Sequence, residues 1–159
     1  MGGFGSGRIR WSTRATVEDS ISLNISKLFQ RGIIGPWSGG GTLLWRSVET
    51  GEESCSVGFW VDAEDEEQVI LNLKYAVTRD DVKTDIKEAV RLTYTRPHFG
   101  GKRWWFRCPL KKNGKVCNTR VGRLHLPPRA QFFGCRNCYS LTYQSCQESH
   151  RFEVEYRSP

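Results

Sequence analysis

The sequence lacks the long apolar runs that membrane insertion and secretion require. It contains no stretch of about 18 apolar residues, and its first residues, MGGFGSGRIRW, lack the apolar segment of a signal peptide. We therefore expect no membrane partner and a cytoplasmic protein, whose thiols stay reduced. In that compartment the 6 cysteines favour metal binding over disulfide bonds.

Acidic residues are missing from a long part of the chain. Residues 89–147 contain twelve Lys or Arg and no Asp or Glu, whereas residues 48–73 contain eight acids and no Lys or Arg. The formal net charge is +7. Such asymmetry is typical of a surface that meets nucleic acid. The alternative is a solvated basic surface that only keeps the protein soluble.

Catalytic signatures are also scarce. The chain has no G-x-S-x-G, and no histidine is spaced for a Cys–His or Ser–His pair. The GFGSG at 3–7 has neither a preceding strand nor a following P-loop lysine. Carboxylates that a metal-dependent nuclease would need occur in segments typical of ordinary turns, at 62–67, Asp80, Asp81, Asp85 and Glu88. We expect no enzyme and no small-molecule substrate, with a nuclease as a less favoured alternative.

Composition divides the chain into four parts and predicts an α+β, mainly β fold. The parts are a flexible Gly/Arg arm at 1–15, a helix plus β-sheet domain at 16–97, a zinc-ribbon module at 98–146 and a tail at 147–159. Within the second part, Thr16 can cap a helix whose apolar face continues to Phe29, and Gly32 can end it.

Four segments predict a roughly four-stranded antiparallel sheet. TLLWRSV at 42–48 and SCSVGFWV at 54–61 form a predicted hairpin, and QVILNLKYAV at 68–77 alternates in its second half. The segment 82–95 fits an amphipathic helix as well as a strand, but its threonines and Tyr94 favour a strand.

Two pairs of cysteines predict a metal site. Cys135 and Cys138 have the C-x₂-C spacing, and Cys108 and Cys117 lie upstream with KKNG between them as a turn insertion. Four thiolates saturate a structural zinc ion and leave no position for a catalytic water. We therefore predict one structural Zn²⁺, whose binding contributes on the order of 10 kcal/mol to folding a ribbon at about 103–145.

Other candidate ligands are less favoured. Cys146 lies eight residues beyond Cys138 and is an alternative to Cys117. Cys55 alternates with apolar residues and is expected to be a small buried hydrophobe. His98 is a weaker candidate, because a lone histidine is more often structural.

Aromatic residues beside basic residues predict contacts with unpaired bases and phosphates. Alternation along a strand means that Trp104 and Trp105 cannot both face the core. The candidate nucleic-acid-binding residues are Arg8, Arg10, Trp11, Lys102, Arg103, Trp104, Trp105, Lys111 and Lys112.

The two ends of the chain resemble a family of uncharacterised bacterial and phage-associated proteins. The resemblance rests on the opening MGGFGSGR, on HFGGKRWWFRCP at 98–109 and on FGCRNCYSLTYQS at 133–145. In that family the first cysteine pair is usually closer than it is here. The resemblance implies a β-rich middle, a cysteine ribbon and a phage or mobile-element protein in a bacterial host cell, but it implies no reaction.

Together these features predict a non-enzymatic zinc-ribbon protein that binds nucleic acid, either DNA or RNA. The alternative is an inhibitor or adaptor that docks on a protein complex that processes nucleic acid. In that case the acidic hairpin at 49–67 would mimic phosphate, or the basic ribbon would occupy an acidic groove of the partner.

Overall fold

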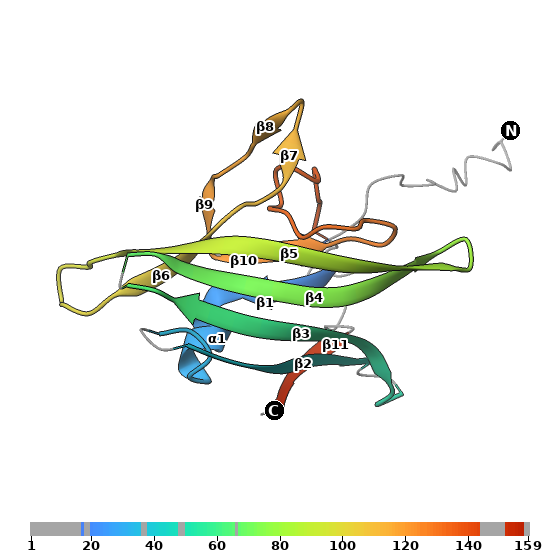
Figure 1. The fold of residues 1–159 in the computed structure, drawn as a ribbon, viewed down its shortest axis with the longest axis horizontal. Coiled ribbons are helices and arrows are strands. Elements are labelled where there is room, and N and C mark those ends of the chain that lie inside the picture. The colour runs from blue at the N-terminus through green and yellow to red at the C-terminus, as the bar shows by residue number, and fades with distance from the viewer. Residues whose placement is uncertain are drawn as a thin grey trace, which may run out of the picture.

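An antiparallel sheet of seven strands, in the order β11-β2-β3-β4-β5-β6-β9, dominates the protein. The computed structural model describes Val17 and residues 20–35, 38–47, 50–65, 67–143 and 152–157. The sheet curls, with the one helix of the described residues and the β1–β10 pair on one side of it (Figure 1). The predicted mainly β fold with one helix is confirmed, while the sheet has more strands than the four expected.

The predicted strands form the centre of this sheet. Strand β2 (Gly39–Ser47) pairs with β3 (Glu53–Ala63), which pairs with β4 (Val69–Arg79), which pairs with β5 (Val82–Thr95). The β4–β5 turn consists of Asp80 and Asp81, with φ angles of 50° and 61°. Positive φ at both central residues is the geometry of a tight hairpin turn, which aspartate tolerates.

Three further strands extend the sheet beyond the prediction. On one side β6 (Arg103–Arg107) pairs with β5, and β9 (Arg120–Val121) pairs with β6. On the other side β11 (Phe152–Arg157) pairs with β2. Because β5 and β6 pair directly, the cysteine-bearing region shares a sheet with the strands that precede it.

The predicted N-terminal helix is partly wrong. Residues 21–24 form strand β1 (Ile21–Asn24), which pairs with β10 (Arg123–Leu126), and helix α1 covers only Ile25–Gln30. The side chain of Asn24 caps this helix by accepting from the backbone N–H groups of Ser26 and Lys27. Ile21, Leu23 and Ile25 recur at every second position, which is the period of a strand, and only Ile25, Leu28 and Phe29 have helical spacing. The expected cap at Thr16 lies outside the described residues.

The main core lies between the sheet and the elements on its concave side. Trp45, Leu71 and Phe106 point inward from the sheet, and their side chains are at most 1% exposed. Ile25 and Leu28 of α1 pack against the same core. The opposite face of β3 to β6 is left open by the described elements (Figure 1).

Candidate metal centre and adjoining basic surface

A hairpin brings the first two cysteines together despite the eight residues between them. Cys108 follows β6, and Cys117 follows the short hairpin of β7 (Lys111–Lys112) and β8 (Lys115–Val116). Asn113 and Gly114, with φ angles of 55° and 77°, form its tight turn. The backbone N–H of Cys117 donates to Leu110 O at 2.9 Å. KKNG is therefore a turn insertion, as the sequence predicted.

The second pair lies on a compact loop that has no room for a side chain at Gly134. A Cβ there would lie 2.7 Å from Cε2 of Tyr139 and 2.9 Å from Cδ2 of Leu110. Gly134 also exchanges two backbone hydrogen bonds with His125 of β10. The backbone N–H of Tyr139 donates to Cys135 O at 3.3 Å, which closes the turn around Cys138.

The four sulfur atoms have the spacing that a tetrahedral ion requires. All four Sγ atoms lie within 4.8 Å of one another. The Cys108–Cys138 and Cys117–Cys135 sulfur distances are both 3.9 Å. A tetrahedral site with zinc–sulfur bonds of about 2.3 Å has sulfur–sulfur distances of about 3.8 Å. The cluster can therefore hold a metal ion with little rearrangement.

The thiols of the cluster differ in their pKa values, and a metal ion would have to displace the protons of the buried ones. Burial raises the pKa of Cys108 to about 11 and also raises the pKa of Cys138. A hydrogen bond with Thr119, whose Oγ1 lies 3.1 Å away, lowers the pKa of the Cys117 thiol to about 7. Buried thiolates this close repel one another, and a bound cation reverses that cost by stabilising the charged forms.

A carboxylate on the sheet fixes the loop that carries Cys135. Glu88 Oε2 accepts from the backbone N–H of Phe133 at 3.1 Å and lies 2.9 Å from Tyr75 Oη. Tyr75 Oη also lies 2.6 Å from the backbone oxygen of Gln131. Burial raises the pKa of Glu88. The sequence did not identify this contact, because Glu88 and Phe133 are far apart along the chain.

Comparisons with known proteins do not add to this geometry. No protein family, curated protein or solved structure matches the chain. The function is therefore inferred from the site's own chemistry. In the described part of the chain, no helix is long and apolar enough to cross a membrane.

The alternative ligands are separate from the cluster. Among the described residues, the four cysteines are the one group of His, Cys, Asp or Glu side chains close enough to share an ion. Cys55 is half-buried against the core, and His98 is exposed. His125 is buried with its Nδ1 2.7 Å from Ser22 Oγ, and burial lowers its pKa to about 4. Cys146 lies outside the described residues.

The acidic residues considered for a nuclease are divided between turns and strands, with Asp62 in β3 and Asp85 and Glu88 in β5. The Asp65 side chain accepts from the backbone N–H groups of Glu67 and Gln68, both at 2.7 Å, and so stabilises the β3–β4 turn. Asp80 and Asp81 form the β4–β5 turn described above.

The two adjacent tryptophans have different environments. Trp104 is 5% exposed and packs edge-to-face on Tyr94, so its ring is part of the core and is not available to a nucleic acid. Trp105 lies on the open face, and its Nε1 donates to Thr95 Oγ1 at 3.0 Å. The Cζ of Arg103 lies 4.4 Å from the centre of the Trp105 ring.

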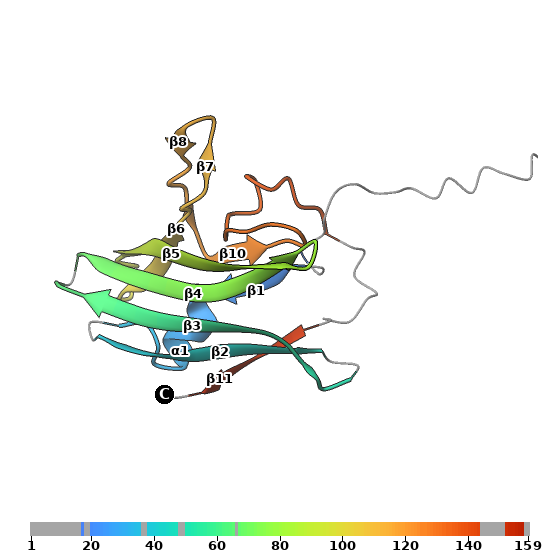
Figure 2. The same cartoon turned by 45° about the vertical axis from the view of Figure 1, so that its right-hand side comes forward.

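The remaining candidates lie on the β7–β8 hairpin and in the loop before β6. Lys111 and Lys112 are exposed on the β7–β8 hairpin, which projects from the sheet in both views (Figures 1 and 2). Lys102 lies with its Nζ 4.5 Å from the Tyr94 ring centre. The predicted contacts at Arg8, Arg10 and Trp11 lie outside the described residues.

The structure adds a basic residue that sequence patterns did not identify. Arg120 on β9 places its Cζ 5.4 Å from the centre of the Trp105 ring. The pairing of Arg107 with Arg120 brings a third guanidinium to the same face. Period-2 alternation predicts which side of its own strand a residue occupies, but not which distant strand lies beside it.

Proposed function

We propose that the protein binds nucleic acid without catalysing a reaction, and that a single zinc ion on Cys108, Cys117, Cys135 and Cys138 holds the binding surface in place. Zinc is the proposed metal because four thiolates in a tetrahedral arrangement suit it and leave no open coordination position. The ion's role is structural: it joins the hairpin after β6 to the loop after β10.

The observation that carries the proposal is the position of Trp105. Its half-buried indole lies on the open face of β6 between the guanidinium groups of Arg103 and Arg120, at 4.4 and 5.4 Å from the ring centre. Both guanidinium groups lie over the ring. A base can therefore stack on a guanidinium plane, or on the ring itself once an arginine turns to a phosphate, and the arginines supply charge for the adjacent phosphates. No acid occurs in residues 89–147 to oppose that charge.

The lysine hairpin extends the basic surface. Lys111, Lys112 and Lys115 are all exposed on β7 and β8, and the hairpin starts and ends at two of the metal ligands. Loss of the metal would therefore release the hairpin from its position beside the sheet. This links zinc occupancy to affinity for nucleic acid.

The proposal is tested by fluorescence anisotropy with labelled single-stranded and duplex oligonucleotides at low salt. We expect submicromolar to micromolar binding, with the single strand preferred because stacking on Trp105 needs an unpaired base. Trp105→Leu should weaken binding of the single strand, and Lys111→Glu with Lys112→Glu should weaken binding of every sequence to a similar degree. Lys27→Glu is the matched control, because Lys27 is an exposed lysine on α1 on the other side of the sheet.

Absence of binding to DNA and RNA near micromolar concentrations would reject the proposal. The alternative, docking on a protein complex that processes nucleic acid, would then be the better explanation of the basic surface. The resemblance to phage-associated proteins supports a phage or mobile-element origin in a bacterial cytoplasm, and this setting is part of the proposal.

A further inference from the structure

A second tryptophan stands on the open face of the sheet, away from the metal centre. Trp60 on β3 is 54% exposed, although tryptophan usually buries most of its surface. Its ring lies over Gly40, its direct partner on β2. A Cβ at Gly40 would lie 2.7 Å from Cε3 of Trp60, so only glycine allows the ring this position. The indole is exposed and also held in place.

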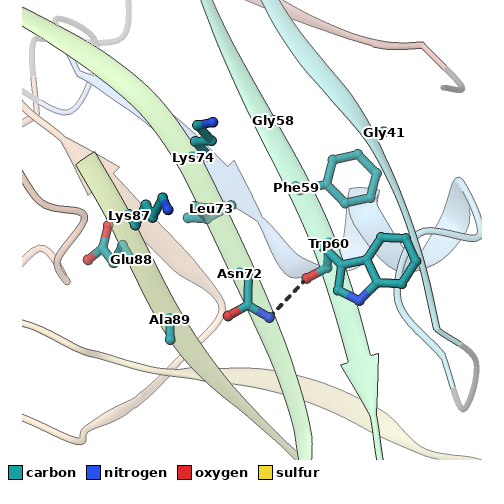
Figure 3. Close-up of a pocket in the computed structure, with 10 residues that line it drawn as sticks. All are labelled: Gly41, Gly58, Phe59, Trp60, Asn72, Leu73, Lys74, Lys87, Glu88 and Ala89. Carbon is teal, nitrogen blue, oxygen red and sulfur yellow. Dashed lines mark hydrogen bonds between the residues drawn. The ribbon is translucent and has the colours of Figure 1, made fainter. Parts of the chain in front are cut away.

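A hollow of about 460 Å³ adjoins this ring. Small residues, Gly58 and Ala89, form part of its lining, and Asn72 stands beside the tryptophan (Figure 3). The amide nitrogen of Asn72 donates to Trp60 O at 3.5 Å. Its amide oxygen has no hydrogen-bond partner among the described residues.

Two lysines and Glu88 complete the lining of the hollow. The Glu88 carboxylate is hydrogen-bonded to Phe133 and Tyr75, so the two lysines favour an anion. Lys74 on β4 is the direct register partner of Lys87 on β5, and both line the hollow and are exposed. Like charges directly opposite one another destabilise a sheet. Neither lysine forms an ion pair with any residue in the described part of the chain. A phosphate between them would remove the repulsion.

We propose that this hollow binds one unpaired nucleotide, with its base stacked on Trp60, its base edge on the Asn72 amide and its phosphate on Lys74 and Lys87. The hollow offers a planar ring for the face of the base, an amide for its polar edge and two cations for the phosphate. The inference rests on the proposed function and extends it: the nucleotide belongs to the strand that also stacks on Trp105.

The strand register gives the separation of the two tryptophans. Trp60 pairs with Asn72, which pairs with Ala89, while Trp105 pairs with Thr93 four residues further along β5. Three strand spacings across and four residues along correspond to about 20 Å. The duplex rise of about 3.4 Å per nucleotide is shorter than the step of an extended single strand, so at most about six nucleotides are needed to reach both rings.

The surface between the tryptophans is predominantly basic. The register places Arg91 on the open face of β5 between the two rings, and Arg107 faces the same side from β6. Asp62 and Asp85 are the acids on this face of β3 to β5. The route from Trp105 to Trp60 can therefore hold a run of phosphates, which favours a nucleic-acid strand over an acidic peptide of irregular charge.

The inference is tested by anisotropy at fixed low salt with a dinucleotide, which is too short to reach both rings, and with an oligonucleotide of about 12 nucleotides, in DNA and RNA form. The wild type should bind the longer strand more tightly. Trp60→Ala should lower the affinity for the longer strand about 5- to 150-fold, the effect of one lost stacked base. It should lower the affinity for the dinucleotide less, because the dinucleotide reaches only one ring and can still bind at Trp105. Trp60→Phe should restore most of the affinity lost for the longer strand.

Matched controls separate this surface from the rest of the protein. Phe29→Ala removes an aromatic ring of similar exposure, 47%, from α1 on the other side of the sheet, and should change neither affinity. Lys74→Gln with Lys87→Gln should lower the affinity for the longer strand, whereas Lys27→Gln should not. Thermal melting of each variant checks that it folds.

The possible results are distinguishable. Equal affinity of wild type and Trp60→Ala for the longer strand would overturn this inference while leaving the proposed function in place. Tight competition by a free mononucleotide would also overturn it, because the hollow would then serve a small ligand and not a strand. No binding of any oligonucleotide would reject the proposed function and this inference with it.

Discussion

Replacing Glu88 tests how the sheet positions the cysteine loop. The carboxylate accepts from the backbone N–H of Phe133, a residue that is fully buried, and it contacts Tyr75 Oη. Glu88→Ala leaves that N–H unpaired, at a cost of about 1–3 kcal/mol, and removes a second hydrogen bond of about 1 kcal/mol. We expect the free energy of unfolding to fall by about 2–4 kcal/mol.

Glu88→Gln should behave differently, because the amide oxygen can still accept from Phe133 N–H while the charge is removed. Burial raises the folded-state pKa of Glu88 above its ordinary value of 4.5. The protonated form is thus favoured by folding, and its stabilisation is complete below pH 4.5 and is lost as the pH rises through the folded-state pKa. Relative to wild type, Glu88→Gln should gain stability from about pH 4.5 upward and then reach a plateau.

The assay is denaturant unfolding at a series of pH values, with excess zinc and with wild type and variant compared at each pH. Acid releases the metal from both proteins, so the difference in unfolding free energy between wild type and variant at each pH does not include that effect. Equal destabilisation by Glu88→Gln and Glu88→Ala would refute the reasoning, as would a difference between Glu88→Gln and wild type that does not change with pH.

Three further predictions concern the metal centre and its supports. Metal analysis should find one zinc per chain, lost in Cys117→Ser and retained in Cys146→Ser. Retention in Cys117→Ser with loss in Cys146→Ser would show that Cys146 is the fourth ligand and Cys117 is not. Gly134→Ala should lower stability by about 1–3 kcal/mol, measured by unfolding, because the added methyl overlaps the Tyr139 ring. Burial lowers the pKa of His125 to about 4, so the neutral ring is favoured and stability should fall as the pH drops from about 6.5 to about 4. His125→Gln should show a smaller fall over that interval in parallel unfolding titrations.

Local patterns predicted the strands and the grouping of the four cysteines. The segments predicted at 42–48, 54–61, 68–77 and 82–95 each correspond to one strand, β2 to β5, apart from end residues, because alternation and turn residues act over a few residues. The cysteine cluster could also be predicted, since ligand type and short spacing define a metal site without knowledge of the rest of the fold.

Features that depend on distant partners could not be predicted. The segment 21–24 has a strand partner about one hundred residues away in β10, which the sequence pattern did not identify. The contact between Glu88 and Phe133 and the approach of Arg120 to Trp105 depend on which strands become neighbours. The hollow beside Trp60 depends on the register of three strands.

The salt dependence of single-strand binding tests the central claim most directly. Contacts from Arg103, Arg120, Lys111 and Lys112 to phosphates should each contribute about 0.7 to the slope of log affinity against log salt concentration. The account predicts a slope of about −3 for the wild type, reduced by more than 1 when Lys111 and Lys112 are both changed to Gln. Undetectable binding at low salt, or a slope that the lysine substitutions leave unchanged, would contradict it.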